Sequence, residues 1–145
     1  MATTYDAIWG FEEDILEVRG RFKEHVWLAH LSQPMGIPLH KYKGKVTLDE
    51  HKITFIGKDK DTQQPSEFTI PRQKILKAYL GWDDVIRRWK DTRAWIKPLR
   101  ITFKTDGESR VLYLYAKEES TAVYGGENRR LYEELKRVKY GHKSI

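Results

Sequence analysis

The segment Gly44–Gly57, GKVTLDEHKITFIG, alternates apolar and polar residues on both sides of a short polar turn. Val46 and Leu48 point to one face before the turn, and the second half repeats the pattern with Ile53 and Phe55. A period of two is typical of half-buried strands. The segment therefore predicts a β-hairpin, with the turn at residues 49–52 and one apolar face against a core.

The same period continues through four more segments, up to residue 117. Pro71 ends the first of them, SEFTIP. The second, KILKAYLGW, would place four apolar side chains on one face: Leu76, Ala78, Leu80 and Trp82. The third and fourth, LRITFK and VLYLYAK, flank a hairpin turn at Asp106 and Gly107. VLYLYAK is apolar on both faces, so we expect it to be covered on both sides.

The apolar period changes from two to that of a helix after Asn128. Leu131, Leu135 and Val138 recur at helical spacing, and Asn128 is a residue type that caps helix starts. The sequence therefore predicts a C-terminal amphipathic helix followed by a frayed tail over residues 139–145.

The first 42 residues give a mixed signal. Six apolar residues fit a helical stripe: Ile8, Phe11, Ile15, Val18, Phe22 and Val26. Gly10 and Gly20 weaken a helix, and residues 26–31 fit a strand equally well. We expect a short helical or irregular lead-in, then a strand near residues 26–31, then a loop over SQPMGIP.

About seven short strands and one helix predict a mainly β (α+β) fold. A small antiparallel barrel or sandwich, with the C-terminal helix capping an open end, would bury the inward faces and remove the exposed edges. The chain has 145 residues, enough for one domain with its own core. We therefore expect a single domain over residues 1–145, with the lead-in at 1–42, the barrel core and helix at 43–138 and the tail at 139–145.

The strand order with its final helix, and the runs GKVTLDEHKITFIG and FTIPRQKILKAYLGW, resemble the pleckstrin-homology-like superfold, in particular GRAM-type and uncharacterised bacterial members. The resemblance covers about residues 43–138. It implies a binding scaffold that engages phospholipid headgroups, peptides or partner domains and does not catalyse. In phosphoinositide-binding relatives basic side chains flank the first hairpin; here these are Lys41, Lys43, Lys45 and Lys52. The turn departs from that pattern, because Asp49 and Glu50 would repel a phosphate.

The composition excludes several classes of function and site. The 27 Lys and Arg residues outnumber 21 Asp and Glu, a net charge of +6, which is weaker than that of a dedicated nucleic-acid arm. There is no cysteine, which excludes disulfides, thiolate nucleophiles and sulfur-ligated metals. The start lacks the pattern of a signal peptide, and no apolar run approaches the ~20 residues of a membrane span. We expect a soluble, cytoplasmic protein.

The insertion at residues 82–100 is the best candidate for a binding site. It holds six basic and three acidic residues, a local net charge of +3, together with the indoles of Trp89 and Trp95. The candidate residues for a partner or an anionic surface are Arg87, Arg88, Trp89, Lys90, Arg93, Trp95 and Lys97. Charge alone would supply about 3 kcal/mol at an anionic membrane, whereas micromolar binding needs about 8 kcal/mol, so the indoles would have to contribute.

The same stretch has a purely structural interpretation. Asp83 or Asp84 could cap a turn in which Val85, Ile86 and Trp89 pack back on the barrel while the basic residues face water. Trp82 continues the apolar face of its strand and is expected in the core. Adjacent aspartates point apart, so a cap fits them better than an acid–base pair.

Catalytic and metal signatures are absent from the sequence. The five histidines (His25, His30, His40, His51 and His142) lack metal-ligand spacing, and no GxSxG, P-loop or GxGxxG motif occurs. Basic residues interleaved with Trp89, Trp95 and Tyr79 resemble a stacking groove for nucleic acid, but the modest charge argues against that partner. We expect no cofactor, no metal and no enzyme activity.

The sequence thus predicts a non-catalytic binding module. A protein or peptide partner, or a second copy of the chain, is the first interpretation. Peripheral binding to anionic membrane lipids through residues 82–100 is the alternative. A small-ligand pocket or enzyme is the second alternative and would need convergent polar groups.

Overall fold

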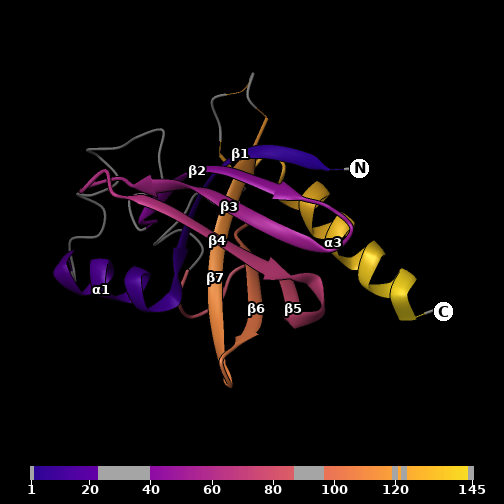
Figure 1. Ribbon diagram of the computed structural model, residues 1–145. Helices are drawn as coiled ribbons and strands as arrows, with labels where there is room; N and C mark the ends of the chain where they lie inside the picture. The colour runs from indigo at the N-terminus through magenta and orange to yellow at the C-terminus, as the bar shows by residue number, and fades with distance from the viewer. Residues whose placement is uncertain (1, 23–39, 87–96, 119–120, 122–123, 144–145) are drawn as a thin grey trace.

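The computed structural model describes residues 2–22, 40–86, 97–118, 121 and 124–143. Seven antiparallel strands form one sheet in the order β4-β3-β2-β1-β7-β6-β5. The strands are β1 (Thr3–Phe11), β2 (Tyr42–Leu48), β3 (Lys52–Asp59), β4 (Pro65–Pro71), β5 (Ile75–Leu80), β6 (Leu99–Thr105) and β7 (Glu108–Lys117). The helices are α1 (Glu12–Phe22), the short 3-10 helix η2 (Arg72–Lys74) and α3 (Asn128–Lys143). Figure 1 shows β5, β6 and β7 running steeply across the direction of β2, β3 and β4, so that the sheet curls into a half-barrel.

Strand β1 lies at the centre of the sheet, which shows that the predicted helical or irregular lead-in is wrong for residues 3–11. It pairs with β2 on one side and with β7 on the other. Tyr5, Ala7 and Trp9 face the core, whereas Ile8 is buried on the opposite face against Tyr115. Apolar residues on both faces conceal a period of two. The strand was therefore missed because it is buried twice.

The helical stripe of the lead-in is confirmed only for α1, which starts at Glu12. Three acidic residues fill its first turn, where the helix dipole favours negative charge. Ile15 is fully buried and packs with Val85, Ile86 and Tyr113 on the outer side of the sheet. The predicted strand at 26–31 and the predicted loop at 32–38 lie outside the described residues.

Strand β7 is covered on both faces, as its sequence predicts. Leu112, Leu114 and Ala116 belong to the main core. Tyr113 packs on the other face with Ile15, and Tyr115 packs there with Ile8. The hairpin before β7 has the predicted turn, with Asp106 at φ 46° and Gly107 at φ 81°.

Strand β5 departs from the predicted alternation. Leu76 is 51% exposed, and Ile75 points into the core instead. The pairing of β5 with β6 shifts between Ile75 and Lys77, and such a bulge reverses which side chains face inward. After the bulge the prediction holds for Ala78 and Leu80, which pack against the core. Trp82 lies beyond the strand and is half-buried.

Helix α3 packs across β5, β6 and β7, with Leu131 and Leu135 in the main core. Two details of the prediction are wrong. The helix continues to Lys143, so residues 139–143 are helical and the expected frayed tail does not begin at 139. Asn128 does not cap the helix, because its side chain bonds to the backbone of β7 and to the carbonyl oxygen of Lys97.

The sheet curls without closing, so the predicted complete barrel is only partly formed. Strands β4 and β5 lie at opposite ends of the strand order and are not neighbours in it. Pro65 and Pro71 bound β4, and proline reduces the donors that an edge strand offers to another chain. Among the described strands, the outer edge of β4 is therefore blunted by its prolines.

Strands β2 and β3 approach each other closely at Gly44 and Gly57, which are directly opposite in the register. A Cβ atom on Gly57 would lie 2.3 Å from the carbonyl oxygen of Lys43 and 2.7 Å from the indole of Trp9. We expect Gly57→Ala to destabilise the protein by about 1–3 kcal/mol, because backbone and indole must both move. Urea unfolding measures this loss. Gly107→Ala provides a contrast, because its cost comes from the positive φ, with open space around the added Cβ. Equal broadening of the NMR signals of the Trp9 indole in both variants would contradict the packing explanation for Gly57.

Candidate functional site

Most of the predicted binding residues lie outside the described part of the chain. These are Arg87, Arg88, Trp89, Lys90, Arg93 and Trp95, and their role stays a prediction. Lys97 is described and exposed, with its Nζ 5.8 Å from the centroid of the Trp82 ring. Its carbonyl oxygen accepts a 2.7 Å hydrogen bond from Asn128 Nδ2. Lys97 thus anchors the end of the insertion to the start of α3.

The start of the insertion is organised by Asp83. Its Oδ1 accepts hydrogen bonds from the amides of Val85 and Ile86, both at 2.9 Å. Its Oδ2 accepts from Arg100 Nη1 at 2.9 Å and from the Tyr113 hydroxyl at 2.7 Å. The predicted capping role is confirmed for Asp83, with Val85 and Ile86 buried. Arg100 is used in this network, so it adds little to a positive rim.

The Asp83 carboxylate is held in its charged form. Burial would raise its pKa, but the hydrogen bonds from Tyr113, from the two amides and from Arg100 together lower the pKa below its usual value. Burial and the neighbouring carboxylate raise the pKa of Tyr113 above its usual value. The phenol therefore stays protonated and donates to Asp83, which is a structural role.

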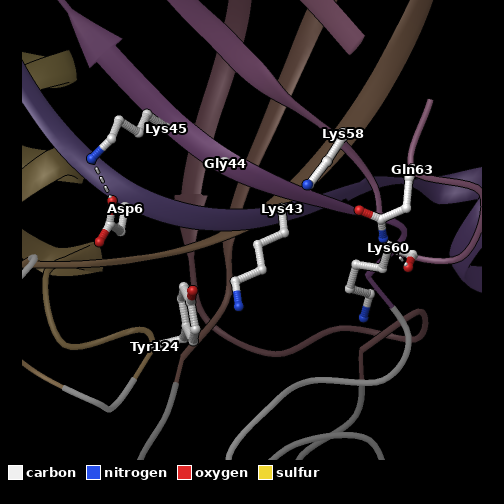
Figure 2. Close-up of a pocket in the computed structure, with 8 residues that line it drawn as sticks. All are labelled: Asp6, Lys43, Gly44, Lys45, Lys58, Lys60, Gln63 and Tyr124. Carbon is white, nitrogen blue, oxygen red and sulfur yellow. Dashed lines mark hydrogen bonds and ion pairs between the residues drawn. The ribbon is translucent and has the colours of Figure 1, made fainter. Parts of the chain in front are cut away.

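A pocket of about 570 Å³ lies on the outer face of β1, β2 and β3 (Figure 2). We call it the lysine pocket. Its lining residues are Asp6, Lys43, Gly44, Lys45, Lys58, Lys60, Gln63 and Tyr124. Figure 2 shows Lys43 projecting between Tyr124 on one side and Lys60 on the other. Among the described residues of the lining, four lysines and one aspartate give a net charge of +3.

The strand register brings the lysines together. Lys43 of β2 is directly opposite Lys58 of β3, and Lys45 is opposite Ile56, which is 54% exposed. Like charges directly opposite on neighbouring strands destabilise a sheet. This lysine pair therefore opposes folding.

The β3–β4 turn adds Lys60 and Gln63 to the pocket. Asp59 Oδ1 accepts hydrogen bonds from the amides of Asp61 and Thr62, at 2.8 and 3.2 Å, which fixes the turn. The Lys60 amide bonds to the carbonyl oxygen of Lys41 at 2.9 Å. Gln63 has φ 64° and its Nε2 donates to the Lys60 carbonyl oxygen. The turn is thus rigidly held beside the two strands.

Asp6 compensates part of the positive charge. Its Oδ1 lies 2.9 Å from Lys45 Nζ and its Oδ2 lies 3.4 Å from Lys117 Nζ. The hydrogen bond from Lys45 is the main cause that lowers the pKa of Asp6. One end of the pocket is therefore a compensated ion-pair cluster.

The surroundings of Lys60 disfavour its charged form. Burial lowers its pKa and Lys43 lowers it further, against the opposing effects of Asp61 and Asp59. His40 precedes β2 and is completely buried, with neither ring nitrogen hydrogen-bonded within the described residues. Burial, with Lys60 nearby, lowers the pKa of His40 well below its usual value, so the imidazole is neutral.

Tyr124 provides the aromatic wall of the pocket. Lys43 Nζ lies 6.0 Å and Lys117 Nζ 5.2 Å from its ring centroid, within the range of cation–π attraction. Burial and Asp6 raise the pKa of Tyr124, so the hydroxyl is protonated and can donate a hydrogen bond. The site combines ammonium groups, an amide and a hydroxyl that all donate.

The sequence pattern pointed to two lysines of this site, Lys43 and Lys45, but did not favour them as binding residues. Lys43 and Lys45 were noted beside the hairpin, but the acidic turn at Asp49 and Glu50 counted against them. The register places Lys43 six residues from Asp49, about 20 Å along the strand, so the turn does not face the pocket. Lys58 and Lys60 were missed. The alternation in GKDKD was the available signal, because it projects two lysines to the same face of the chain.

Comparison with protein-family models and with curated proteins found no match to this chain. Neither α1 nor α3, the two α-helices in the described residues, has an apolar stretch that could cross a bilayer. Within the same residues no three His, Asp or Glu side chains gather as a metal site would require.

Proposed function

We propose that this protein is a non-catalytic binding module that holds an anionic group in the lysine pocket. The observation that carries the proposal is the pair Lys43 and Lys58, directly opposite on neighbouring strands, in a pocket whose described lining has a net charge of +3. The strand order with a C-terminal helix supports a pleckstrin-homology-like fold, and a cysteine-free sequence supports a reducing compartment. Both remain part of the proposal.

The carrier of the anionic group is the second part of the proposal. An acidic protein or peptide partner, which could be a second copy of this chain, is the first carrier. An anionic membrane surface is the alternative. Ile56, exposed beside Lys45 and Lys58, offers either carrier an apolar contact next to the charges.

The test is a double charge reversal with a control of equal charge. Lys43→Glu with Lys58→Glu is compared with Lys52→Glu with Lys104→Glu, two exposed lysines away from the pocket. The probes are fluorescent poly-L-glutamate and phosphatidylcholine vesicles with 30% phosphatidylserine. We expect the pocket variant to weaken binding at least about tenfold, since each basic charge contributes about 1 kcal/mol. The control should change it much less. Equal losses in both variants, or no binding of either probe by the wild type, would overturn the proposal.

The single change Lys43→Glu separates binding from folding. It replaces a repulsive pair with an attractive one opposite Lys58, and we expect the free energy of unfolding to rise by about 0.2–1 kcal/mol. Binding of the anionic probe should weaken at the same time. Urea unfolding and probe titration on the same sample measure both effects. A variant that loses both stability and binding would contradict the view that the lysine pair is retained for function.

A further inference from the structure

The outer face of β2 and β3 carries three successive rows of side chains, each made of two residues that are directly opposite in the register. The rows are Lys43 with Lys58, Lys45 with Ile56, and Thr47 with Thr54. Paired Cβ atoms lie about 5 Å apart, and successive rows are two residues, or about 7 Å, apart along the strands. The face therefore presents its chemical groups in a fixed order and at a fixed spacing.

The first row fits one carboxylate group. Lys43 and Lys58 are both exposed, and both line the lysine pocket. A carboxylate has two oxygens that accept hydrogen bonds, so one acidic side chain can bind both ammonium groups at once. A negative charge between the two lysines also relieves their mutual repulsion. An aspartate or glutamate of a partner is therefore well placed at this row.

The second row disfavours another acid and favours an aliphatic side chain. Ile56 is 54% exposed, so a ligand side chain can cover its apolar surface. On one side of Ile56, the Lys45 Nζ donates a 2.9 Å hydrogen bond to Asp6, which Figure 2 shows as a dashed line. On the other side, the exposed Glu67 of β4 is directly opposite Ile56. A carboxylate over Ile56 would meet the negative charge of Glu67, whereas a leucine side chain would not.

The three rows fit an extended peptide better than a membrane surface. Alternate side chains of an extended chain lie on the same side, about 7 Å apart, which is the spacing of the rows. Binding to a bilayer surface depends on buried apolar area in addition to basic charge. The exposed large apolar side chains of the described residues are Leu16 on α1, Ile56 and Leu76 on β5, so this face contributes Ile56 alone. The adjacent threonine row offers hydroxyl groups, which suit a peptide.

We propose that the outer face of β2 and β3 binds an extended peptide in which an acidic and an aliphatic residue are two positions apart. The acid lies between Lys43 and Lys58, and the aliphatic side chain covers Ile56. The residue between them points away from the sheet. This inference rests on the proposed function and names the partner's chemistry at the same site. The face selects the spacing of the two residues, since a peptide can run along the strands in either direction.

The first experiment varies only this spacing. Three short peptides of identical composition contain one aspartate and one leucine separated by zero, one or two serines, and the full chain is titrated with each at low salt by NMR. We expect the peptide with one intervening serine to bind at least about fivefold more tightly than the other two. Equal affinities for the three peptides, with poly-L-glutamate still bound, would overturn this inference and leave the proposed anion binding in place.

Replacement of Ile56 tests the aliphatic contact. Ile56→Ser should remove the preference for one intervening serine, while weak binding of all three peptides through the lysine pair remains. Leu16→Ser, which changes an exposed aliphatic residue on α1, is the matched control and should keep the preference. Lys43→Gln with Lys58→Gln should weaken binding of all three peptides. A preference that persists in Ile56→Ser would overturn the placement of the leucine.

A peptide with a second aspartate in place of the leucine separates shape from charge. It is more negative, yet the wild type should bind it at least about threefold more weakly, because its second carboxylate lies beside Glu67. Glu67→Gln should reduce this difference. Glu50→Gln, which changes an exposed acid in the turn between the same two strands, should not. Tighter binding of the two-aspartate peptide by the wild type would show that charge alone controls binding, and would overturn the inference.

The NMR spectra also show where the peptide binds. The δ1 methyl signal of Ile56 should shift as peptide is added, whereas that of the fully buried Ile101 should not. An unchanged Ile56 signal at saturation would contradict the proposed position. Phosphatidylserine vesicles bound in the absence of any peptide binding would assign the site to a membrane surface and overturn the inference. Failure of peptides, vesicles and poly-L-glutamate together would overturn the proposed function as well.

Discussion

Replacing Asp83 with alanine is expected to lower the free energy of unfolding by about 3–5 kcal/mol at pH 7. The carboxylate accepts four hydrogen bonds, from Val85, Ile86, Arg100 and Tyr113. Without it, the guanidinium of Arg100, whose side chain is only 23% exposed, loses its counter-charge while remaining largely buried. Breaking one partner of such a pair costs more than the pair itself contributes. Urea unfolding measures the loss.

Asp84→Ala is the matched control for this prediction. Asp84 is the adjacent residue of the same type and is exposed, so we expect its replacement to cost less than about 1 kcal/mol. Similar losses for Asp83→Ala and Asp84→Ala would show that local backbone effects, and not the buried network, control stability here.

The contribution of Asp83 should also depend on pH in a defined direction. Its pKa is lower in the folded protein than the usual value of about 3.9 that applies to the unfolded chain. A depressed folded pKa gives stability that is complete above the unfolded pKa and is lost as the pH falls through the folded pKa. The difference in unfolding free energy between wild type and Asp83→Ala should be constant from pH 7 to about 5 and shrink below about 4. A difference that grows on acidification would contradict the assignment.

Asn128→Ala is expected to cost at least about 3 kcal/mol, because three backbone groups lose their partner at about 1–3 kcal/mol each. Asn128 is 2% exposed. Its Oδ1 accepts from the Ala116 amide at 2.7 Å, and its Nδ2 donates to the carbonyl oxygens of Lys97 and Leu114 at 2.7 and 3.2 Å. One side chain thus joins β7, the end of the 82–100 insertion and the start of α3.

Two further variants define the role of Asn128. Asn128→Asp keeps the acceptor but directs a carboxylate at two carbonyl oxygens, so it should be strongly destabilising at pH 7 and partly recover at pH 4, where a protonated acid can donate. Arg129→Ala, at an exposed position of the same helix turn, should change stability by no more than about 0.5 kcal/mol. Thermal and urea unfolding provide the values. An Asn128→Asp variant as stable as wild type at pH 7 would exclude donation by Nδ2.

The sequence predicted the fold best where each strand has one buried face. Residues 43–117 show a clear period of two, and six of the seven strands of the structure fall there. β1 was missed because Ile8 is buried on the face opposite Trp9, which hides the alternation. The exposure of Leu76 was missed because a bulge is a property of pairing with β6, which the residues of β5 alone do not encode.

The lysine pocket was harder to predict than the fold. Its charges come from β1, β2, β3 and the β3–β4 turn, and only the register brings them together. The sequence favoured residues 82–100 as the binding site because basic residues cluster there along the chain. Clusters formed by residues that are distant in sequence are not visible without the strand register. Asn128 shows the same limit: its residue type predicts a cap, whereas its burial assigns it to the backbone of β7.

The position of β1 also affects how the chain folds during its translation. Asp6 of β1 and Lys117 of β7 are 111 positions apart, yet their strands are hydrogen-bonded neighbours at the middle of the sheet. During translation the first strand emerges long before its second neighbour exists, and long-range pairing of this kind is slow. Nascent chains ending before residue 108 should therefore leave one side of β1 without its partner strand, and they are the forms that a ribosome-associated chaperone would need to shield.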